Sequence, residues 1–149
     1  MILCLGCGFC CDGTLFNRVP LLESEVEVHR EVLHVAAGAH HGVQPCPALD
    51  GTSCRVYERR PLTCRRYRCL LLEAFEAQEV SEAGALEIVE TVKRTRAELA
   101  EALGLPTSGA VVEEARRRRS TLTGSERERL ERLERQLHFH FLGQRAAQR

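Results

Sequence analysis

Cysteine is the residue of this chain whose type and spacing most clearly point to chemistry. The chain has 149 residues, and its first four cysteines follow the pattern C-x-x-C-x-x-C-C. None of the residues beyond position 69 is a cysteine. The eight cysteines are Cys4, Cys7, Cys10, Cys11, Cys46, Cys54, Cys64 and Cys69. Because clustered thiolates are ligands of zinc and of iron–sulfur clusters, the first half of the chain predicts metal binding at these eight positions.

Two kinds of metal centre suit the spacing. Zinc takes four tetrahedral thiolates, and a C-x-x-C turn aims two sulfurs at one ion. The run from Cys4 to Cys10 also reproduces the C-x-x-C-x-x-C of bacterial ferredoxins, and Cys46-Pro47 resembles their remote ligand. Adjacent Cys10 and Cys11 point in different directions, so we expect them to bind different ions. The eight thiolates therefore form two sites or one polynuclear site, and spacing alone assigns neither the pairing nor the metal.

Disulfides are the competing interpretation of an even number of cysteines. A secretory signal needs a basic region and about 7–15 apolar residues before its cleavage site, and no such stretch precedes Cys4. The sequence also lacks a run of about 18 apolar residues, so we expect no membrane span. These features predict a cytoplasmic protein, in which reducing conditions leave thiols available to metal ions.

Arginines are interleaved with the last three cysteines. Guanidinium groups lower the pKa of nearby thiols and would offset the charge of about −2 on a four-thiolate zinc site. The alternative is a solvated face with salt bridges to acids such as Glu58. The arginines are Arg55, Arg59, Arg60, Arg65, Arg66 and Arg68. By contrast, His40 and His41 are expected to be exposed loop histidines, since thiolates already suffice for tetrahedral sites.

The charge distribution argues against nucleic acid as a partner. The formal net charge is zero, and neither half of the chain is polybasic. Glutamates surround the run Arg116–Arg119, which predicts a solvated helix face with ion pairs. The leucine stripe at Leu130, Leu133 and Leu137 favours packing on the core, and a protein partner at these C-terminal helices is the alternative. No nucleophile elbow, P-loop or dinucleotide fingerprint occurs, so no catalytic residue is identified.

Short elements must position the cysteines. Glycines in residues 1–14 allow tight turns, and Asp12-Gly13 predicts one of them. We expect an edge strand within 14–22, a helix over 25–37 begun by the capping pair Ser24 and Glu27, and a hairpin at Asp50-Gly51. A helix over 63–72 would begin at Pro61. Its two cysteines, five residues apart, do not share a face, so the helix must break or the cysteines must bind different metals.

The second half of the chain is predicted to be helical. We expect one helix from Ser81 to Gly104, a second over 108–119, and a third that begins at the capping pair Thr123 and Glu126 and buries residues up to Phe141. The predicted fold is mainly α. A cysteine-rich, loop-dominated metal module at 1–72, with a small hairpin, is followed by a helical extension at 73–149 that packs on it as a single compact domain.

Three segments together resemble a known family. They are CLGCGFCC from Cys4, CPALDGTSC from Cys46 and YERRPLTCRRYRC from Tyr57. Their combination, over about residues 4–70, is similar to the CxxCxxCC family of zinc- or iron-chelating proteins. The resemblance implies metal binding by the eight cysteines, with Tyr57, Arg60, Pro61 and Arg65 as supporting residues. Flagellin lysine N-methylase is a larger relative whose motif is associated with an iron–sulfur cluster, so an enzyme related to protein-lysine methylation is an alternative.

Overall fold

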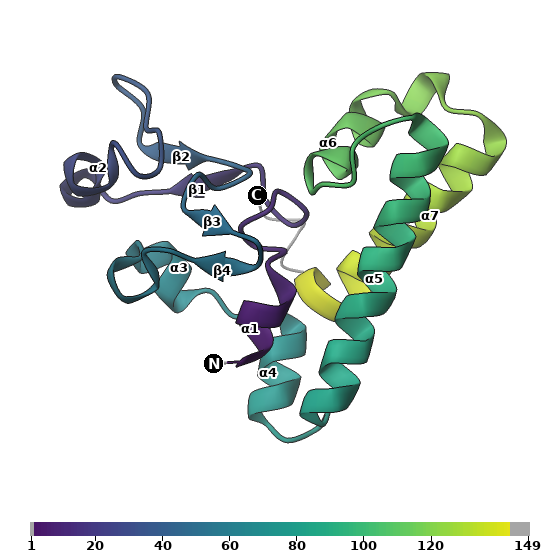
Figure 1. Cartoon of the computed structure of the whole chain (residues 1–149), viewed down its shortest axis with the longest axis horizontal. Helices are drawn as coiled ribbons and strands as arrows, with labels where there is room; N and C mark the ends of the chain where they lie inside the picture. Colours follow the sequence, from purple (N-terminus) through teal and green to yellow (C-terminus); the bar gives the residue numbers. More distant parts are fainter. Residues whose placement is uncertain (1, 144–149) are drawn as a thin grey trace.

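The computed structural model describes residues 2–143 and is mainly α-helical, as the sequence predicts. Figure 1 shows a small lobe of short strands and helices beside a lobe of longer helices. The small lobe contains α1 (Ile2–Cys7), β1 (Arg18–Pro20), α2 (Glu23–His29), β2 (His41–Val43), β3 (Leu49–Asp50), β4 (Ser53–Cys54), η1 (Tyr57–Arg59) and α3 (Leu62–Arg66). The helical lobe contains α4 (Leu70–Glu76), α5 (Glu82–Leu103), α6 (Ala110–Arg117), η2 (Arg119–Thr121), α7 (Gly124–Leu137) and the π-helical turn η3 (His138–Leu142).

Two antiparallel pairs of strands shape the small lobe. β1 pairs with β2 in a two-stranded sheet, so each strand has one neighbour. Pro20 at the end of β1 has no N–H to donate, and on such an edge strand no hydrogen bond between strands is lost. β3 pairs with β4 across the predicted turn, where Gly51 adopts a φ of 59°. The predicted hairpin is confirmed, and its pairing of Leu49 with Cys54 fixes the position of one cysteine.

The predicted helix over 25–37 is wrong in its bounds. The helix that forms, α2, ends at His29, and its capping residues are Leu22 and Glu25 rather than Ser24 and Glu27. Beyond it the chain turns, with His34 at a φ of 49°. This turn brings Leu33 and Val35 into a small buried cluster, whereas Val28 of α2 stays 75% exposed. Burial of Leu33 and Val35 therefore outweighs continuation of the helix.

The predicted helix over 63–72 is divided into two. α3 ends at Arg66, because Tyr67 is extended, and α4 begins at Leu70 with Cys69 as its N-cap. The expected break between Cys64 and Cys69 is therefore present. Pro61 precedes α3 and is fully buried.

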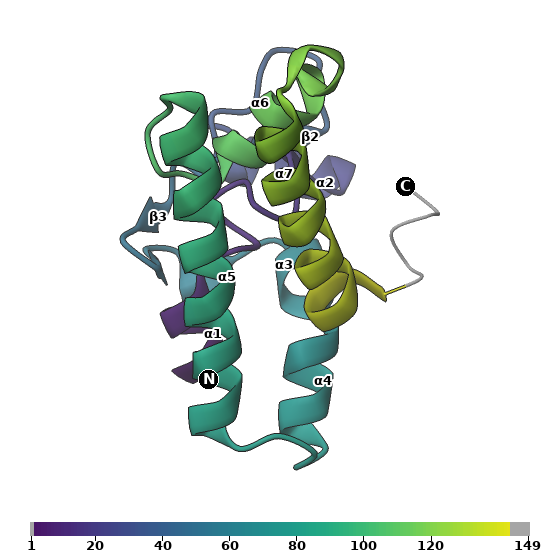
Figure 2. The same ribbon diagram turned by 90° about the vertical axis from the view of Figure 1, so that its right-hand side faces the viewer.

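The helical lobe follows the capping signals in the sequence. Ser81 accepts a hydrogen bond from the Gly84 N–H at 3.1 Å, and Gly104 ends α5 with a φ of 64°. Thr123 and Glu126 form the predicted capping box of α7. Figure 2 shows α5 and α7 side by side, and the two helices contact each other along their apolar faces.

The predicted ion pairs of the 116–119 run are present, but they also join separate elements. Arg118 pairs with Glu114 within α6, as a helical spacing of four allows. Arg116 and Arg119 both pair with Glu134, so these cations connect α6 and η2 to α7.

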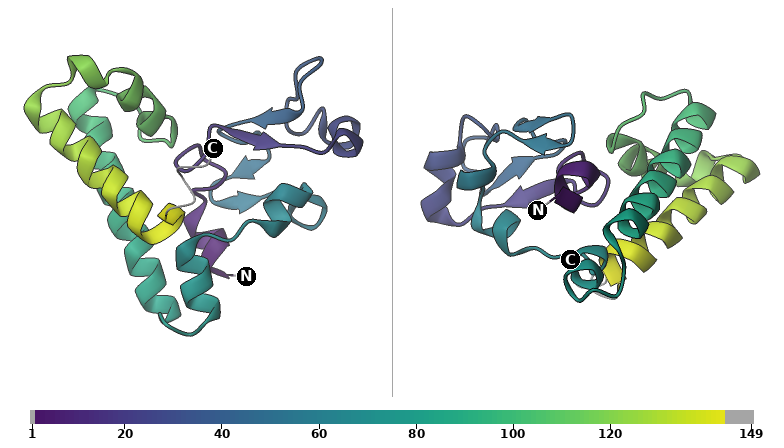
Figure 3. Two further views of the ribbon diagram at one scale, coloured as in Figure 1. Left: turned by 180° about the vertical axis from the view of Figure 1, so that it is seen from behind. Right: turned by 60° about the horizontal axis from the view of Figure 1, so that its bottom comes forward.

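One hydrophobic cluster extends across the two predicted parts of the chain. Phe9, from the loop after α1, is fully buried, and its ring contacts Phe141 of η3 edge to face at 5.4 Å. Figure 3 shows α1 and this loop between the strands and the long helices. A second, smaller cluster lies under the strands and consists of Val19, Leu21, Leu33, Val35 and Ala48. Within residues 2–143, no helix has the length and apolar character needed to cross a membrane.

Candidate metal centre

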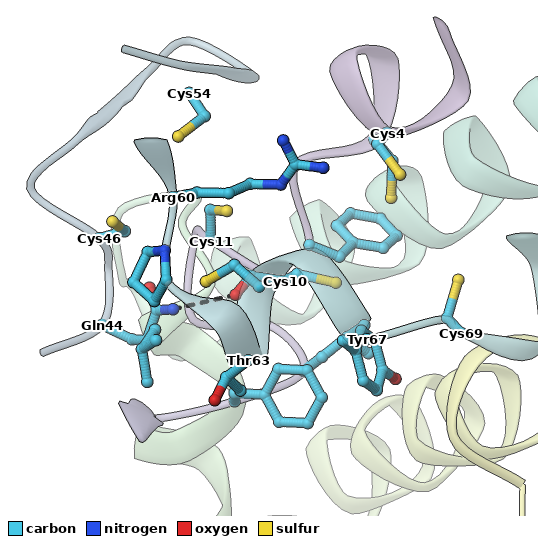
Figure 4. Close-up of a pocket in the computed structure, with 18 of the residues that line it drawn as sticks. Cys4, Cys10, Cys11, Gln44, Cys46, Cys54, Arg60, Thr63, Tyr67 and Cys69 are labelled. Carbon is cyan, nitrogen blue, oxygen red and sulfur yellow. Dashed lines mark hydrogen bonds between the residues drawn. The ribbon is translucent and has the colours of Figure 1, made fainter. Parts of the chain in front are cut away.

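All eight cysteines line one cavity of about 160 Å³. Figure 4 labels Cys4, Cys10, Cys11, Cys46, Cys54 and Cys69, which come from α1, the loop after it, the β3–β4 region and the start of α4. All eight are in the thiol form, with no disulfide among residues 2–143, and each is partly buried. The structure therefore gathers residues that are up to 65 positions apart, from Cys4 to Cys69, around one space.

The first group of thiols lies beside α1 and α4. Burial raises the pKa of Cys7 to about 12, and the charges of Cys69 and Cys4 add to that rise. Burial likewise raises the pKa of Cys10, and the charges of Cys69, Cys7, its sequence neighbour Cys11 and Cys4 act in the same direction. In Figure 4, Cys4 and Cys69 lie on one side of the cavity, and Cys11, Cys46 and Cys54 lie on the other. From these positions, and because the charges of Cys69 and Cys4 act on Cys7 and Cys10, we assign Cys4, Cys7, Cys10 and Cys69 to one group, the helix-side set.

The second group surrounds the β3–β4 hairpin. Burial raises the pKa of Cys11 to about 12, and the charges of Cys46, Cys64 and Cys54 raise it further. Burial also raises the pKa of Cys64 to about 11, with the charges of Cys46 and Cys54 next in effect. We call Cys11, Cys46, Cys54 and Cys64 the hairpin-side set. This assignment places the adjacent Cys10 and Cys11 in different sets, although the charge of Cys11 also acts on Cys10.

Local geometry positions the helix-side set. Cys4 and Cys7 are three residues apart on α1, so they lie on neighbouring positions of one helix face. Gly8, at a φ of 76°, then turns the chain towards Cys10. Cys69 caps α4, and its Sγ accepts a hydrogen bond from the Leu72 N–H at 3.4 Å.

Backbone and side-chain hydrogen bonds position the hairpin-side set. The Cys46 N–H donates to the Cys11 carbonyl at 2.7 Å, which holds these two residues together. The Gln44 side chain donates to the Cys10 carbonyl at 3.0 Å from the same segment. Glu25 accepts a hydrogen bond from the Leu62 N–H at 2.7 Å and so fixes the start of the helix that carries Cys64.

The eight cysteines share a cavity without forming a compact set of ligands. Among residues 2–143, no three His, Cys, Asp or Glu side chains form a ready-made metal site. The raised pKa values of Cys7, Cys11 and Cys64 have the same origin, because buried thiols that crowd together resist ionisation unless a cation compensates them. A bound metal would supply that charge, so the donor set fits a thiophilic metal.

The arginines interleaved with the last three cysteines differ in how close they lie to the thiols. Burial raises the pKa of Cys4, whereas Arg68 and Arg60 oppose that rise. Arg60 likewise opposes the raised pKa of Cys64. Arg59 and Arg66 are exposed. Arg60 and Arg68 line the cavity, and the exposed Arg55 also opposes the burial that raises the pKa of Cys46, whereas Arg59 and Arg66 match the alternative of a solvated face.

Two of the remaining supporting residues, Tyr57 and Pro61, lie beside Arg60, whereas Arg65 does not line the cavity. The Arg60 guanidinium lies 3.8 Å above the Tyr57 ring, and both residues line the cavity together with Pro61. Arg65 is exposed, and its carbonyl accepts a hydrogen bond from Arg68 at 3.0 Å. His40 and His41 are both exposed, as expected, but His41 lies in the strand β2 rather than in a loop.

Sequence reasoning missed several residues that hold the cysteine segments in place. Asp12 forms the predicted turn, with its carboxylate accepting from the Thr14 N–H at 2.8 Å, but it also pairs with Arg96 of α5. Lys93 of α5 donates to the Gly6 carbonyl at 2.9 Å. No pattern in the sequence predicts a contact between residues more than 80 positions apart. However, Arg96 is a charged residue on the buried face of an amphipathic helix, and that position indicates a buried partner of opposite charge.

Comparison with protein families agrees with this site. The chain matches the family model named CxxCxxCC, described as a "putative zinc- or iron-chelating domain", over residues 3–93. No curated protein and no solved structure matches the chain significantly. The matched range includes all eight cysteines and continues into α5. The match covers more than half of the 149 residues, and the chain therefore belongs to the CxxCxxCC family of metal-chelating domains.

Proposed function

We propose that this metal-binding protein holds two separate metal centres, one in the helix-side set and one in the hairpin-side set. The observation that carries the proposal is that eight thiols line one cavity, with Cys4 and Cys69 on one side of it and Cys11, Cys46 and Cys54 on the other. Four thiolates complete a tetrahedral zinc site, and four cysteines also hold an iron–sulfur cluster. Each set therefore has the full number of ligands for either kind of centre.

The proposed role is structural. The cluster under the strands has only five buried apolar residues, Val19, Leu21, Leu33, Val35 and Ala48, which is a small core for a lobe of this length. Metal binding contributes folding free energy directly when the unfolded chain has no preformed site. Two centres would tie the cysteine segments to one another and would replace the stabilisation that a larger apolar core supplies elsewhere.

An enzymatic role has less support. A catalytic metal keeps an open position for water or substrate, whereas structural sites are closed by protein ligands. Four thiols are available to each proposed centre, which favours closed sites. A thiol-rich site also favours reducing surroundings such as the cytoplasm. We further infer that the parts at 1–72 and 73–149 fold as one unit, because one hydrophobic cluster contains residues of both.

Metal analysis and an optical spectrum of protein purified without oxygen test the proposal. We expect two zinc ions and no visible colour, or two clusters with brown charge-transfer absorption. Protein that carries less than one metal per chain as purified, or whose stability does not fall when the metal is removed, would overturn the proposal. Circular dichroism of the same sample establishes that the chain is folded.

Paired serine substitutions test the division into two sets. C4S/C69S should remove one centre and leave the other, and C46S/C54S should do the same for the opposite set. C10S/C64S is the matched control with two substitutions, and it should impair both centres because it takes one ligand from each. Retention of one intact centre by C10S/C64S would contradict the assigned sets, even if wild-type protein binds two.

A further inference from the structure

Arg60 is held in a fixed direction by two contacts with the same residue. Its guanidinium lies 3.8 Å above the Tyr57 ring, and its Nη1 donates to the Tyr57 carbonyl at 2.5 Å. The following residue, Pro61, is fully buried and anchors the backbone at this point. An arginine on a flexible surface loop would lack both restraints, so the position of this charge is determined by the fold.

The Arg60 side chain crosses the cavity between the two sets. In Figure 4 it extends from the side of Cys11, Cys46 and Cys54 towards Cys4. Arg60 lines the cavity with all eight cysteines and is half-buried, whereas Arg59, one position earlier, is exposed. The two arginines therefore have the same charge and nearly the same place in the sequence, but only the second faces the thiols.

The charge of Arg60 acts on both sets. It lies close enough to Cys4 on the helix side and to Cys64 on the hairpin side for an electrostatic interaction with each. Arg68 acts on Cys4 and Arg55 acts on Cys46, so each of these influences a thiol of one set. The electrostatic influence of Arg60 on both sides agrees with its place in Figure 4.

We propose that Arg60 is a counter-cation shared by the two metal centres and that it determines the affinity of both. The inference rests on the proposed function of two four-thiolate centres. Each such zinc centre carries a charge of about −2, so two centres in one small cavity repel each other. A guanidinium between them offsets the negative charge of both. The ring of Tyr57 holds it there by a cation–π contact, which a flat, weakly hydrated guanidinium makes better than an ammonium group.

Chelator competition on the full-length chain tests this role, with R60Q, R60K and R59Q as the variants. Loaded protein is titrated with a chromophoric chelator, and the loss of each centre is followed separately. We expect R60Q to weaken both centres about tenfold, because a neighbouring cation shifts a thiolate equilibrium by about one pKa unit or more. R60K should recover part of the loss, and R59Q should stay within about twofold of wild type.

Each other outcome overturns the inference in a different way. Equal behaviour of R60Q and R59Q means that the position of Arg60 has no effect. Weakening of one centre alone means that the charge is not shared. Equal weakening in R60K and R60Q means that shape rather than charge is responsible. If wild-type protein binds no metal, the proposed function fails as well, which the metal analysis reveals before any Arg60 variant is measured.

A second variant guards against misfolding of R60Q. Y57L removes the ring under the guanidinium and leaves the charge in the chain. Circular dichroism of each variant without metal shows whether it folds as the wild type does. We expect Y57L to weaken both centres by less than R60Q does, and unchanged affinities in a folded Y57L would contradict the role given to the stacked geometry.

Discussion

Arg96 of α5 donates a hydrogen bond of 2.5 Å to the carboxylate of Asp12, the residue directly after Cys10 and Cys11. The same nitrogen contacts the hydroxyl of Thr14, which is fully buried. Both charged side chains are largely shielded from water, at 10% and 18% exposure. A buried ion pair of this kind connects the loop that contributes to both thiol sets with the longest helix of the protein.

Removal of one partner of this pair should destabilise the fold strongly. R96M leaves the Asp12 carboxylate buried without its cation, and breaking a buried pair in this way costs about 3–5 kcal/mol. Urea denaturation should show that loss. R94M is the matched control, since Arg94 lies on the exposed face of the same helix and should change the free energy of unfolding by less than about 0.5 kcal/mol.

The double variant D12N/R96M separates the pair from other effects of each substitution. Because it removes both charges, it should be more stable than R96M alone, with a coupling free energy above about 1 kcal/mol in a double-mutant cycle. Additive effects of the two substitutions would contradict a direct interaction. Metal content should fall with stability in R96M, since the loop with Cys10 and Cys11 loses its anchor.

Gly109→Ala should disrupt the contact between α6 and the cysteine loop. A Cβ at Gly109 would overlap the backbone carbonyl of Asp12 and the backbone amide of Thr14, and backbone atoms cannot move aside as a flexible side chain can. Overpacking of this severity costs about 3 kcal/mol or more. Thermal unfolding measures the loss. Gly124→Ala is the control, because no atom lies within 4 Å of that position and a helix favours alanine.

Glu25 should make stability depend on acid pH. Slight burial acts to raise its pKa, but hydrogen bonds from the Leu62 and Leu22 N–H groups outweigh that effect and lower it. A carboxylate whose pKa is lower in the folded protein than in the unfolded chain stabilises the fold at pH values above its unfolded pKa, which is near 4.5. This stabilisation disappears as the pH falls through the folded pKa.

The variant E25Q measures that contribution. Because the carboxylate is largely solvated, its loss at pH 7 should cost only about 1 kcal/mol, and the difference from wild type should shrink below pH 4. E27Q removes an exposed carboxylate two residues later and should have little effect at either pH. A constant difference between E25Q and wild type across pH 3–7 would exclude the charge as its cause.

Metal loading should release protons. Burial raises the pKa of Cys7 and Cys11 to about 12, so these thiols are protonated at neutral pH without metal. Ligands bind as thiolates, and calorimetry in buffers of different ionisation enthalpy should detect about four protons per bound metal at pH 7.5. Affinity should therefore fall as pH falls. Release of fewer than about two protons per metal would contradict four thiolate ligands.

The same thiols should destabilise the metal-free protein at alkaline pH. In the unfolded chain the thiols of Cys7 and Cys11 ionise near pH 9, whereas burial raises their pKa in the folded protein to about 12. The contribution of these thiols to the free energy of unfolding is therefore unchanged below pH 9 and decreases as the pH rises from 9 towards 12. Melting curves of metal-free protein should show this fall, and metal-loaded protein should show much less of it.

The sequence determined the features that depend on neighbouring residues. Ser81, Gly104 and the pair Thr123 and Glu126 cap their helices through hydrogen bonds or backbone angles within four residues, so their patterns predicted the bounds of α5 and the start of α7. The turn at Asp50-Gly51 is local in the same sense. The cysteine pattern predicted the kind of chemistry because thiolates have few other uses at such density.

Only the tertiary structure decided which residues act together. Spacing could not show that Cys69 lies near Cys4, or that Cys64 lies near Cys11, because these contacts depend on how α3 and α4 return to the first loop. The true cap of α2 escaped prediction because Glu25 also binds Leu62, 37 residues away. The Asp12–Arg96 pair spans 84 residues. Contacts between residues so far apart in the sequence form when the whole chain buries its apolar side chains. A short sequence pattern contains no information about which distant residue will contact it.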